Sequence, residues 1–170
     1  LFELMRLLAL APIPVAAAIT GHGPAGGCVL AFACHQRVMA QGRFKIGLNE
    51  VAVGVRVPDL VWACARHVLG PRLAERLCTS GELVDPERAL ALGIVDELAP
   101  PEEVVPRALA WCTAQLALPP QALRSTRALA RRELAAAFEA FDARALEGFL
   151  DEWFADECQA TLRAMVAKLA

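Results

Sequence analysis

The sequence predicts an α/β fold that ends in a helical C-terminal region. Before Glu102, short apolar runs with strand character alternate with helical patterns, an order that usually places helices on a sheet. From Glu102 to the end the pattern is nearly all helical, interrupted at Pro119–Pro120 and loosened near Gly148. At 170 residues we expect one domain, with an α/β core over residues 1–118 and a helical region over residues 119–170.

The composition indicates a helix-rich protein with a substantial core, because 56% of the residues are hydrophobic and only 6% are aromatic. Seventeen basic and nineteen acidic residues give a net charge of −2, so we expect no nucleic-acid partner and no membrane-surface partner. No apolar run is long and charge-free enough to span a bilayer, and no secretory signal opens the sequence.

The six cysteines are spread along the chain, without a C-x-x-C pair or the Cys/His spacing of a metal site. Most of them stand among Ala, Leu and Val. This usage indicates reduced core thiols in an intracellular protein. We therefore predict no metal and no disulfide framework.

The first elements follow from apolar spacing. Leu1–Ala9 has the one-sided apolar pattern of a helix, and the prolines at positions 12 and 14 end it. Val15–Ile19 reads as a short buried strand. After a glycine-rich turn, the segment from Gly26 to Cys34 is apolar on nearly every side, as in a core helix.

Two further strands are predicted next, over Arg37–Ala40 and Arg43–Ile46, with Gln41–Gly42 as the turn of a hairpin. Gly47–Glu50 is expected to be a loop.

Three helices with early proline and late glycine are predicted after this loop. They begin at Pro58, Pro71 and Pro86, and they end at Gly70, Gly81 and Gly93. Ile94–Leu98 is the last strand candidate.

The chain is organised around the turn between Val15–Ile19 and the buried helix that follows. A helix N-terminus offers unpaired N–H donors and about half a positive charge, and glycine lets a ligand approach the backbone. This turn has three interpretations. It is a tight connection with glycine chosen for packing, a dinucleotide site, or an oxyanion hole in which the Gly26 amide stabilises charge on a carbonyl oxygen.

The dinucleotide interpretation depends on Gly21–Gly26, which spells G-x-G-x-x-G. That motif requires an acidic residue at the end of the next strand, about 20 residues on. Here the next strand candidate ends in Ala40 and Gln41, so a nucleotide-binding αβ unit stays a remote alternative.

A longer stretch favours the oxyanion hole. The segment ITGHGPAGGCVLAFACHQRVMAQGRFKIGLNEVAVG, residues 19–54, resembles the enoyl-CoA hydratase/isomerase (crotonase) family. The likeness continues through ERALALGIVDELAPPEEV, residues 87–104, and PAGGC with IGLNE favours the family's mitochondrial-type Δ3,Δ2-enoyl-CoA isomerases. The resemblance implies a crotonase-like spiral of β-β-α turns, here partial, with a C-terminal helical region that makes trimer contacts or closes over the substrate.

The resemblance also implies site residues. Gly26 takes the place of the oxyanion-hole glycine, and Glu50 takes that of the catalytic carboxylate, although an isolated Glu in a loop is usually just solvated. Apolar neighbours favour burial of Glu50, and burial raises a carboxyl pKa. The remaining expected substrate-binding residues are His22, Pro24, Ala25 and Leu48.

Val29 separates isomerase from hydratase. Hydratases of the family carry a second Glu at the position that Val29 fills, and adding water needs two carboxylates. With Glu50 alone, a 1,3-proton shuttle remains feasible. We therefore expect an enzyme that shifts the double bond of 3-enoyl-CoA to give 2-trans-enoyl-CoA in fatty-acid β-oxidation, without a cofactor beyond the coenzyme A of the substrate.

Family membership implies further expectations. These are a homotrimer or hexamer, and a location in the mitochondrial matrix of a eukaryote or the cytoplasm of a bacterium. Family members carry a further N-terminal half that supplies the second oxyanion amide, so we expect these residues alone to form an incomplete site; the sequence also does not start with Met. A non-catalytic crotonase-like assembly module or truncated pseudoenzyme is the alternative.

Two side-chain groups have open interpretations. Arg124, Arg127 and Arg131 share one helical face, which is either solvated or faces the phosphates of coenzyme A. The C-terminal region also carries an aromatic stripe that serves core or subunit packing, or covers the acyl chain. Its members are Phe138, Phe141, Phe149, Trp153 and Phe154.

Overall fold

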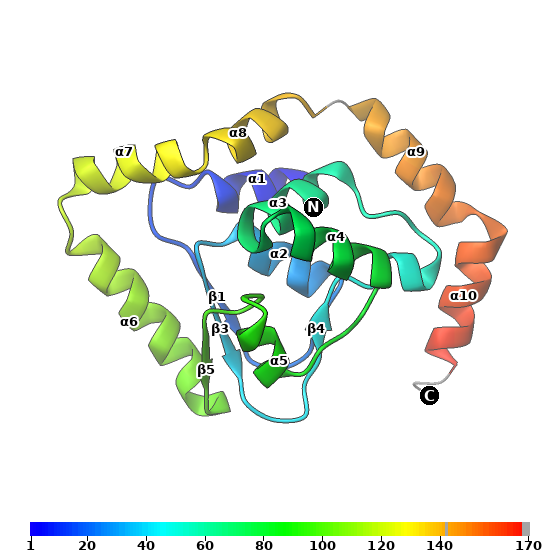
Figure 1. Cartoon of the computed structure of the whole chain (residues 1–170), viewed down its shortest axis with the longest axis horizontal. Helices are drawn as coiled ribbons and strands as arrows, with labels where there is room; N and C mark the ends of the chain where they lie inside the picture. Colours follow the sequence, from blue (N-terminus) through cyan, green and yellow to red (C-terminus); the bar gives the residue numbers. More distant parts are fainter. Residues whose placement is uncertain (142, 168–170) are drawn as a thin grey trace.

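The computed structural model describes residues 1–141 and 143–167, without the side chains of residues 143–145. A central α/β unit is enclosed by an arc of helices that runs from α6 to α10 (Figure 1). The central unit comprises α1 (Phe2–Ala9), β1 (Ala16–Ile19), β2 (Gly23–Pro24), α2 (Gly26–Ala33), β3 (Gln36–Ala40), β4 (Ile46–Gly47), the 3-10 turn η1 (Val51–Val53), α3 (Asp59–Leu69), α4 (Pro71–Ser80), α5 (Pro86–Ala91) and β5 (Glu97–Ala99). The arc comprises the 3-10 turn η2 (Pro101–Glu103), α6 (Val104–Leu116), α7 (Pro120–Ala130), α8 (Arg132–Glu139), α9 (Ala143–Phe154) and α10 (Asp156–Val166). The predicted α/β class with a helical C-terminal region is confirmed.

The main sheet is parallel, in the order β1-β3-β5. Successive side chains of β3 point to opposite faces, as strand geometry requires. Met39 belongs to the main core that includes α2, whereas Val38 packs with Val104 and Ala108 of α6. The sheet is therefore covered by helices on both faces, which suits a parallel sheet.

The predicted hairpin is wrong. Ile46–Gly47 forms a second, two-stranded sheet with β2, and that pairing is parallel. On its other edge Ile46 exchanges two backbone hydrogen bonds with Val84, at 3.0 and 2.9 Å. These partners lie far away in the sequence, so the turn residues Gln41 and Gly42 could not indicate this pairing. The new pairing places the segment after β4 beside the start of α2.

The predicted helix boundaries are confirmed within a residue or two. Gly70 and Gly81 follow α3 and α4 with φ angles of 73° and 62°, a backbone conformation that favours glycine. Asp85 caps α5 by accepting a hydrogen bond of 2.8 Å from the Arg88 N–H.

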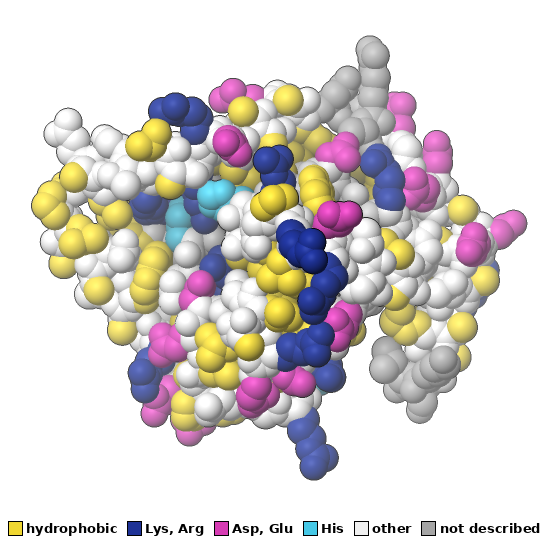
Figure 2. Space-filling view, in the orientation of Figure 1, with side chains coloured by type: hydrophobic (Ala, Val, Ile, Leu, Met, Phe, Trp, Pro, Cys, Tyr) yellow, Lys and Arg dark blue, Asp and Glu magenta, His cyan; other side chains and the backbone are white. Residues whose placement is uncertain are grey.

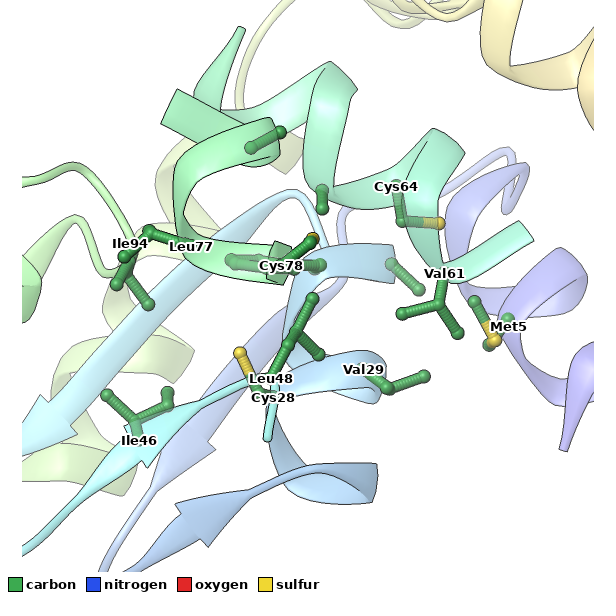
Figure 3. Packing of buried hydrophobic residues seen from close by; sticks show 14 of the residues in the cluster. Met5, Cys28, Val29, Ile46, Leu48, Val61, Cys64, Leu77, Cys78 and Ile94 are labelled. Atoms are coloured by element: carbon green, nitrogen blue, oxygen red, sulfur yellow. The ribbon is translucent and has the colours of Figure 1, made fainter. Parts of the chain in front are cut away.

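The main core is built from α1 to α5, β3, β4 and α8. Figure 3 shows part of it, where side chains of α1, α2, α3, α4 and β4 meet. Its fully buried side chains include Met5, Phe32 and Met39. All six cysteines are free, and all but Cys112 are buried. Burial raises the pKa of the thiols of Cys64 and Cys78, to about 12 and about 11, so these groups stay neutral.

Arg127 and Arg131 of the predicted arginine face are not simply solvated, because both donate hydrogen bonds to backbone carbonyls. The Arg131 guanidinium donates to the carbonyls of Ala9, Ala33 and Cys34 at 2.8, 3.0 and 2.9 Å. Arg127 donates to the Ile13 carbonyl at 2.7 Å. The two side chains therefore fasten the junction of α7 and α8 to the C-terminal ends of α1 and α2, where a helix dipole favours a cation. Arg124 alone of the three is exposed.

Within the described residues, no helix is long and apolar enough to cross a membrane. The same residues contain no group of three or more His, Cys, Asp or Glu side chains placed to hold a metal ion.

Candidate active site

A cavity of about 670 Å³ lies between the N-terminus of α2, the segment that follows β4, and the helices α9 and α10. Its lining is apolar apart from a few groups, and Glu50 is its only ionisable side chain among the described residues. Apolar walls with few polar groups are typical of a site for an organic ligand.

The backbone at the start of α2 is arranged to present N–H groups. Ala25 has φ 45° and ψ −111°, a conformation that non-glycine residues rarely adopt. It is held there because its N–H donates to the Gly47 carbonyl at 2.9 Å and its carbonyl accepts from the Val29 N–H at 2.8 Å. Strain of this kind persists where the surroundings fix it, often at functional sites.

The Gly26 amide is consequently a free donor at a helix N-terminus. It donates no hydrogen bond within the described part of the chain, and a Cβ added at Gly26 would meet nothing within 4 Å. A carbonyl oxygen in the cavity can therefore approach this amide without a steric barrier. An oxyanion there is stabilised by the N–H and by the positive end of the helix dipole.

Glu50 is held by the turn that it starts. Its carbonyl accepts hydrogen bonds from the N–H groups of Val53 and Val55, both at 3.0 Å. Its carboxylate is half-buried, and Oε2 is buried without a hydrogen-bond donor. Burial raises the pKa of Glu50 above its ordinary value. A carboxylate in this state is suited to take a proton from carbon and to return it.

Two neighbours of Glu50 define the chemistry of the cavity. Val29 lies in the first turn of α2, is 2% exposed and lines the cavity, so no second carboxylate stands there. Asn49 also lines the cavity, and its Oδ1 is buried without a donor. Asn49 was not expected from the sequence, where only its position next to Glu50 sets it apart.

The structure brings together Pro24, Ala25, Gly26 and Glu50 in one cavity, but it places His22 and Leu48 elsewhere. The His22 ring packs edge-on against Phe44, with centroids 5.5 Å apart, and its Nδ1 accepts from the Lys45 N–H at 3.1 Å. Leu48 is 3% exposed and points into the core near Cys28 (Figure 3). Neither side chain lines the cavity, so the structure does not bring these two expected substrate-binding residues to it.

The aromatic stripe divides between two roles. Phe138 is buried in the main core, and Phe141 packs against Phe2 with ring centroids 5.2 Å apart. Phe149, Trp153 and Phe154 line the cavity instead. The C-terminal helices thus form one wall of the candidate site.

Comparison with known proteins agrees with this geometry. Residues 1–162 match the family described as enoyl-CoA hydratase/isomerase. The chain is 32% identical over 168 residues to human mitochondrial enoyl-CoA delta isomerase 1, covering 98% of this chain and 56% of the human protein. It is 37% identical over 117 residues to a probable enoyl-CoA hydratase, EchA17, of Mycobacterium tuberculosis, covering 69% of this chain and 44% of that protein.

Solved structures give the same result. The crystal structure of human mitochondrial delta3-delta2-enoyl-CoA isomerase superposes with a TM-score of 0.90 at 32% identity, over 99% of this chain and 66% of that chain. The enoyl-CoA hydratase EchA3 of Mycobacterium ulcerans superposes with a TM-score of 0.78 at 32% identity, over 89% of this chain and 64% of that chain.

The protein belongs to the enoyl-CoA hydratase/isomerase family, and the predicted crotonase-like fold is confirmed. The chain spans about half the length of the curated relatives that it matches. Relatives named as isomerases and relatives named as hydratases both appear at comparable identity, so the choice between the two reactions depends on the site itself.

Proposed function

We propose that this protein is an enoyl-CoA isomerase that converts 3-enoyl-CoA to 2-trans-enoyl-CoA in fatty-acid β-oxidation. The observation that carries the proposal is the pairing, in one apolar cavity, of a single carboxylate with a free amide at a helix N-terminus. These are Glu50 and Gly26. The resemblance of the surrounding residues to known isomerases supports it.

The proposed reaction begins with proton abstraction at C2. The Glu50 carboxylate takes the C2 proton, and the C–H electron pair forms the C1–C2 double bond of an enolate. The negative charge then rests on the thioester oxygen, which accepts a hydrogen bond from the Gly26 N–H.

The second step returns the same proton. The enolate electrons form the C2–C3 double bond, and the electrons of the former C3–C4 double bond take the proton from the Glu50 carboxylic acid at C4. The carboxylate is regenerated, and no cofactor is consumed. The apolar walls keep water away from the proton between the two steps.

Hydration is disfavoured by the same geometry. Adding water to 2-enoyl-CoA requires one group to activate the water and another to deliver the proton to C2. Glu50 can serve as one of these groups, but Val29 cannot serve as the other. The site therefore supports isomerisation over hydration.

We further propose a homo-oligomer, a trimer or a hexamer. Hydrophobic side chains gather over α6 and α7 (Figure 2). Leu109, Leu116 and Leu129 are 61%, 62% and 59% exposed, and contiguous exposed apolar surface is typical of an interface. The proposed compartment is the mitochondrial matrix in a eukaryote and the cytoplasm in a bacterium.

The direct test of the reaction type compares two substrates. The protein, in the longest natural form that contains these residues, is given 3-enoyl-CoA and 2-enoyl-CoA separately. We expect isomerisation to exceed hydration by at least about 10²-fold, the usual contribution of one general acid or base. Val29→Glu should raise hydration, and Val29→Gln, which has the same size but no acid, should not. Hydration by the unaltered protein at a rate equal to isomerisation would contradict the proposal.

A further inference from the structure

The helices α9 and α10 are joined to the rest of the molecule at the segment that follows Glu50. A small apolar cluster, separate from the main core, joins Val53 and Val55 of this segment to Cys158 of α10. The backbones approach closely, because a Cβ added at Gly54 would lie 3.4 Å from the Cα of Cys158. Gly54 has φ 83°, so glycine suits the position on both grounds.

A polar contact completes this junction. The carboxylate of Glu152, on α9, accepts a hydrogen bond of 3.0 Å from the Arg56 backbone N–H. Its other oxygen lies 3.4 Å from Arg56 Nε. Glu152 was not among the site residues expected from the sequence, since nothing in its surroundings sets it apart from other acids of an amphipathic helix.

We propose that Glu152 is a positioning residue for Glu50, because it fastens the C-terminal helices to the segment that carries the catalytic carboxylate. This inference rests on the proposed function of the cavity.

Glu50 and the segment that follows it form one hydrogen-bonded unit. The Glu50 carbonyl accepts from Val53 and Val55, and Arg56 comes next in the chain. A displacement of the Arg56 backbone is therefore expected to change the position of Glu50, because the two are joined by this hydrogen-bonded turn. The same helices line the cavity with Phe149 and Trp153, so fastening them also excludes water from the Glu50 carboxylate.

Charge does not explain the coupling. The titratable groups that interact electrostatically with Glu50 in the described structure are the thiols of Cys28 on α2 and Cys78 on α4. Burial raises the pKa of both thiols, so both are neutral when Glu50 titrates. Desolvation is the main cause of the raised pKa of Glu50, and no charged group of α9 or α10 contributes to it. Glu152 would therefore act through geometry and water exclusion.

The contact is also weak enough to open. The side chains of Glu152 and Arg56 are 42% and 41% exposed, and exposed ion pairs contribute little to stability.

The test follows the titration of Glu50 itself. The protein is labelled with ¹³C at the Glu side-chain carboxyl, and the Glu50 signal is identified by its loss in Glu50→Gln. In Glu152→Ala we expect the midpoint of this titration to move to lower pH, toward the ordinary value, because water reaches the carboxylate. We also expect kcat for isomerisation to fall by about two- to fivefold, the range set by an exposed polar contact.

Two control variants separate geometry from charge. Glu152→Gln loses the charge but keeps an oxygen that accepts from the Arg56 N–H, so it should retain the original midpoint. Asp151→Ala removes a neighbouring exposed acid of α9 that has no ion pair in the described structure, and it should change nothing. Should Glu152→Ala not fold, Cys158→Ala weakens the same junction from the same side and should move the midpoint in the same direction.

The outcomes distinguish this inference from the proposed function. An unchanged Glu50 midpoint in Glu152→Ala would overturn the positioning role, whatever the activity. A shift in Glu152→Gln as large as that in Glu152→Ala would also overturn it, since charge would then be the cause. Absence of isomerisation in the unaltered protein would contradict the proposed function, while the titration would still decide whether Glu152 acts on Glu50.

Discussion

Glu50 is a carboxylic acid with one oxygen buried beside apolar walls and without a hydrogen-bond donor. Water would solvate that oxygen in the unfolded chain, so the folded state loses this solvation when the group is ionised. The same burial raises the basicity of the carboxylate, which helps it to remove a proton from carbon. The feature that suits the proposed catalysis therefore opposes stability.

This opposition predicts a pH-dependent gain in stability for Glu50→Gln. The pKa of Glu50 is raised in the folded state, so the native protein binds more protons than the unfolded chain as pH rises from about 4.5 through the folded-state value. The contribution of Glu50 to the free energy of unfolding is fully present below that pH range and is lost above it. We expect Glu50→Gln to be more stable than the unaltered protein at pH 7 and the difference to vanish below about pH 4.

Urea unfolding at several pH values measures this difference. Glu87→Gln, an exposed acid of α5, is the matched control and should show no such trend. A variant of Glu50 that is less stable at pH 7, or a difference that does not change with pH, would show that the carboxylate is not buried as described.

The family resemblance singled out Gly26, Val29 and Glu50, and the structure places all three against one cavity. Gly26 and Glu50 stand in a recognisable turn and loop, and Val29 follows from the helix register. The direction in which the side chains of His22 and Leu48 point was not predictable, because it depends on how β2 and β4 pair. Glu152 was not predictable either, because its partner lies 96 positions away in the chain.

At the level of elements, helix boundaries were predictable because proline and glycine act on their own backbone. The pairing of Ile46–Gly47 was not, because its partners are β2 and Val84. The C-terminal helices were expected, but not their course around the core, which is fixed by Arg127 and Arg131.

Arg131 gives a prediction at this scale. Its guanidinium donates three hydrogen bonds to carbonyls at the C-terminal ends of α1 and α2, and α2 is the helix that presents Gly26. Removing the guanidinium takes this donor from the Ala9 and Ala33 carbonyls, while the Cys34 carbonyl still accepts from Arg37 Nη1 at 3.3 Å, and it removes a cation from two helix dipoles. We expect Arg131→Met, which keeps the apolar stem, to lower the free energy of unfolding by about 1–3 kcal/mol.

Chemical denaturation of Arg131→Met measures this loss, and Arg132→Met is the control because Arg132 is an exposed neighbour on α8 with no ion pair in the described residues. Equal stability of the two variants would show that the contacts of Arg131 do not fasten α7 and α8 to the core.

At the level of the whole molecule, the candidate site lies where the central α/β unit meets the arc of helices. The central unit supplies the Gly26 amide and Glu50, and the arc supplies the apolar wall and Glu152. Neither part encloses the cavity alone. In the proposed reaction, one carboxylate in this cavity therefore carries out both proton transfers.

The turnover of 3-enoyl-CoA by Glu50→Gln tests this claim most directly. The measurement uses the longest natural form of the protein that contains these residues, with Glu87→Gln as the control. We expect turnover to fall by about 10²–10⁴-fold, the contribution of a general acid–base group, while substrate affinity stays nearly unchanged. Turnover by Glu50→Gln within about tenfold of the unaltered protein, below the contribution expected of such a group, would contradict the account.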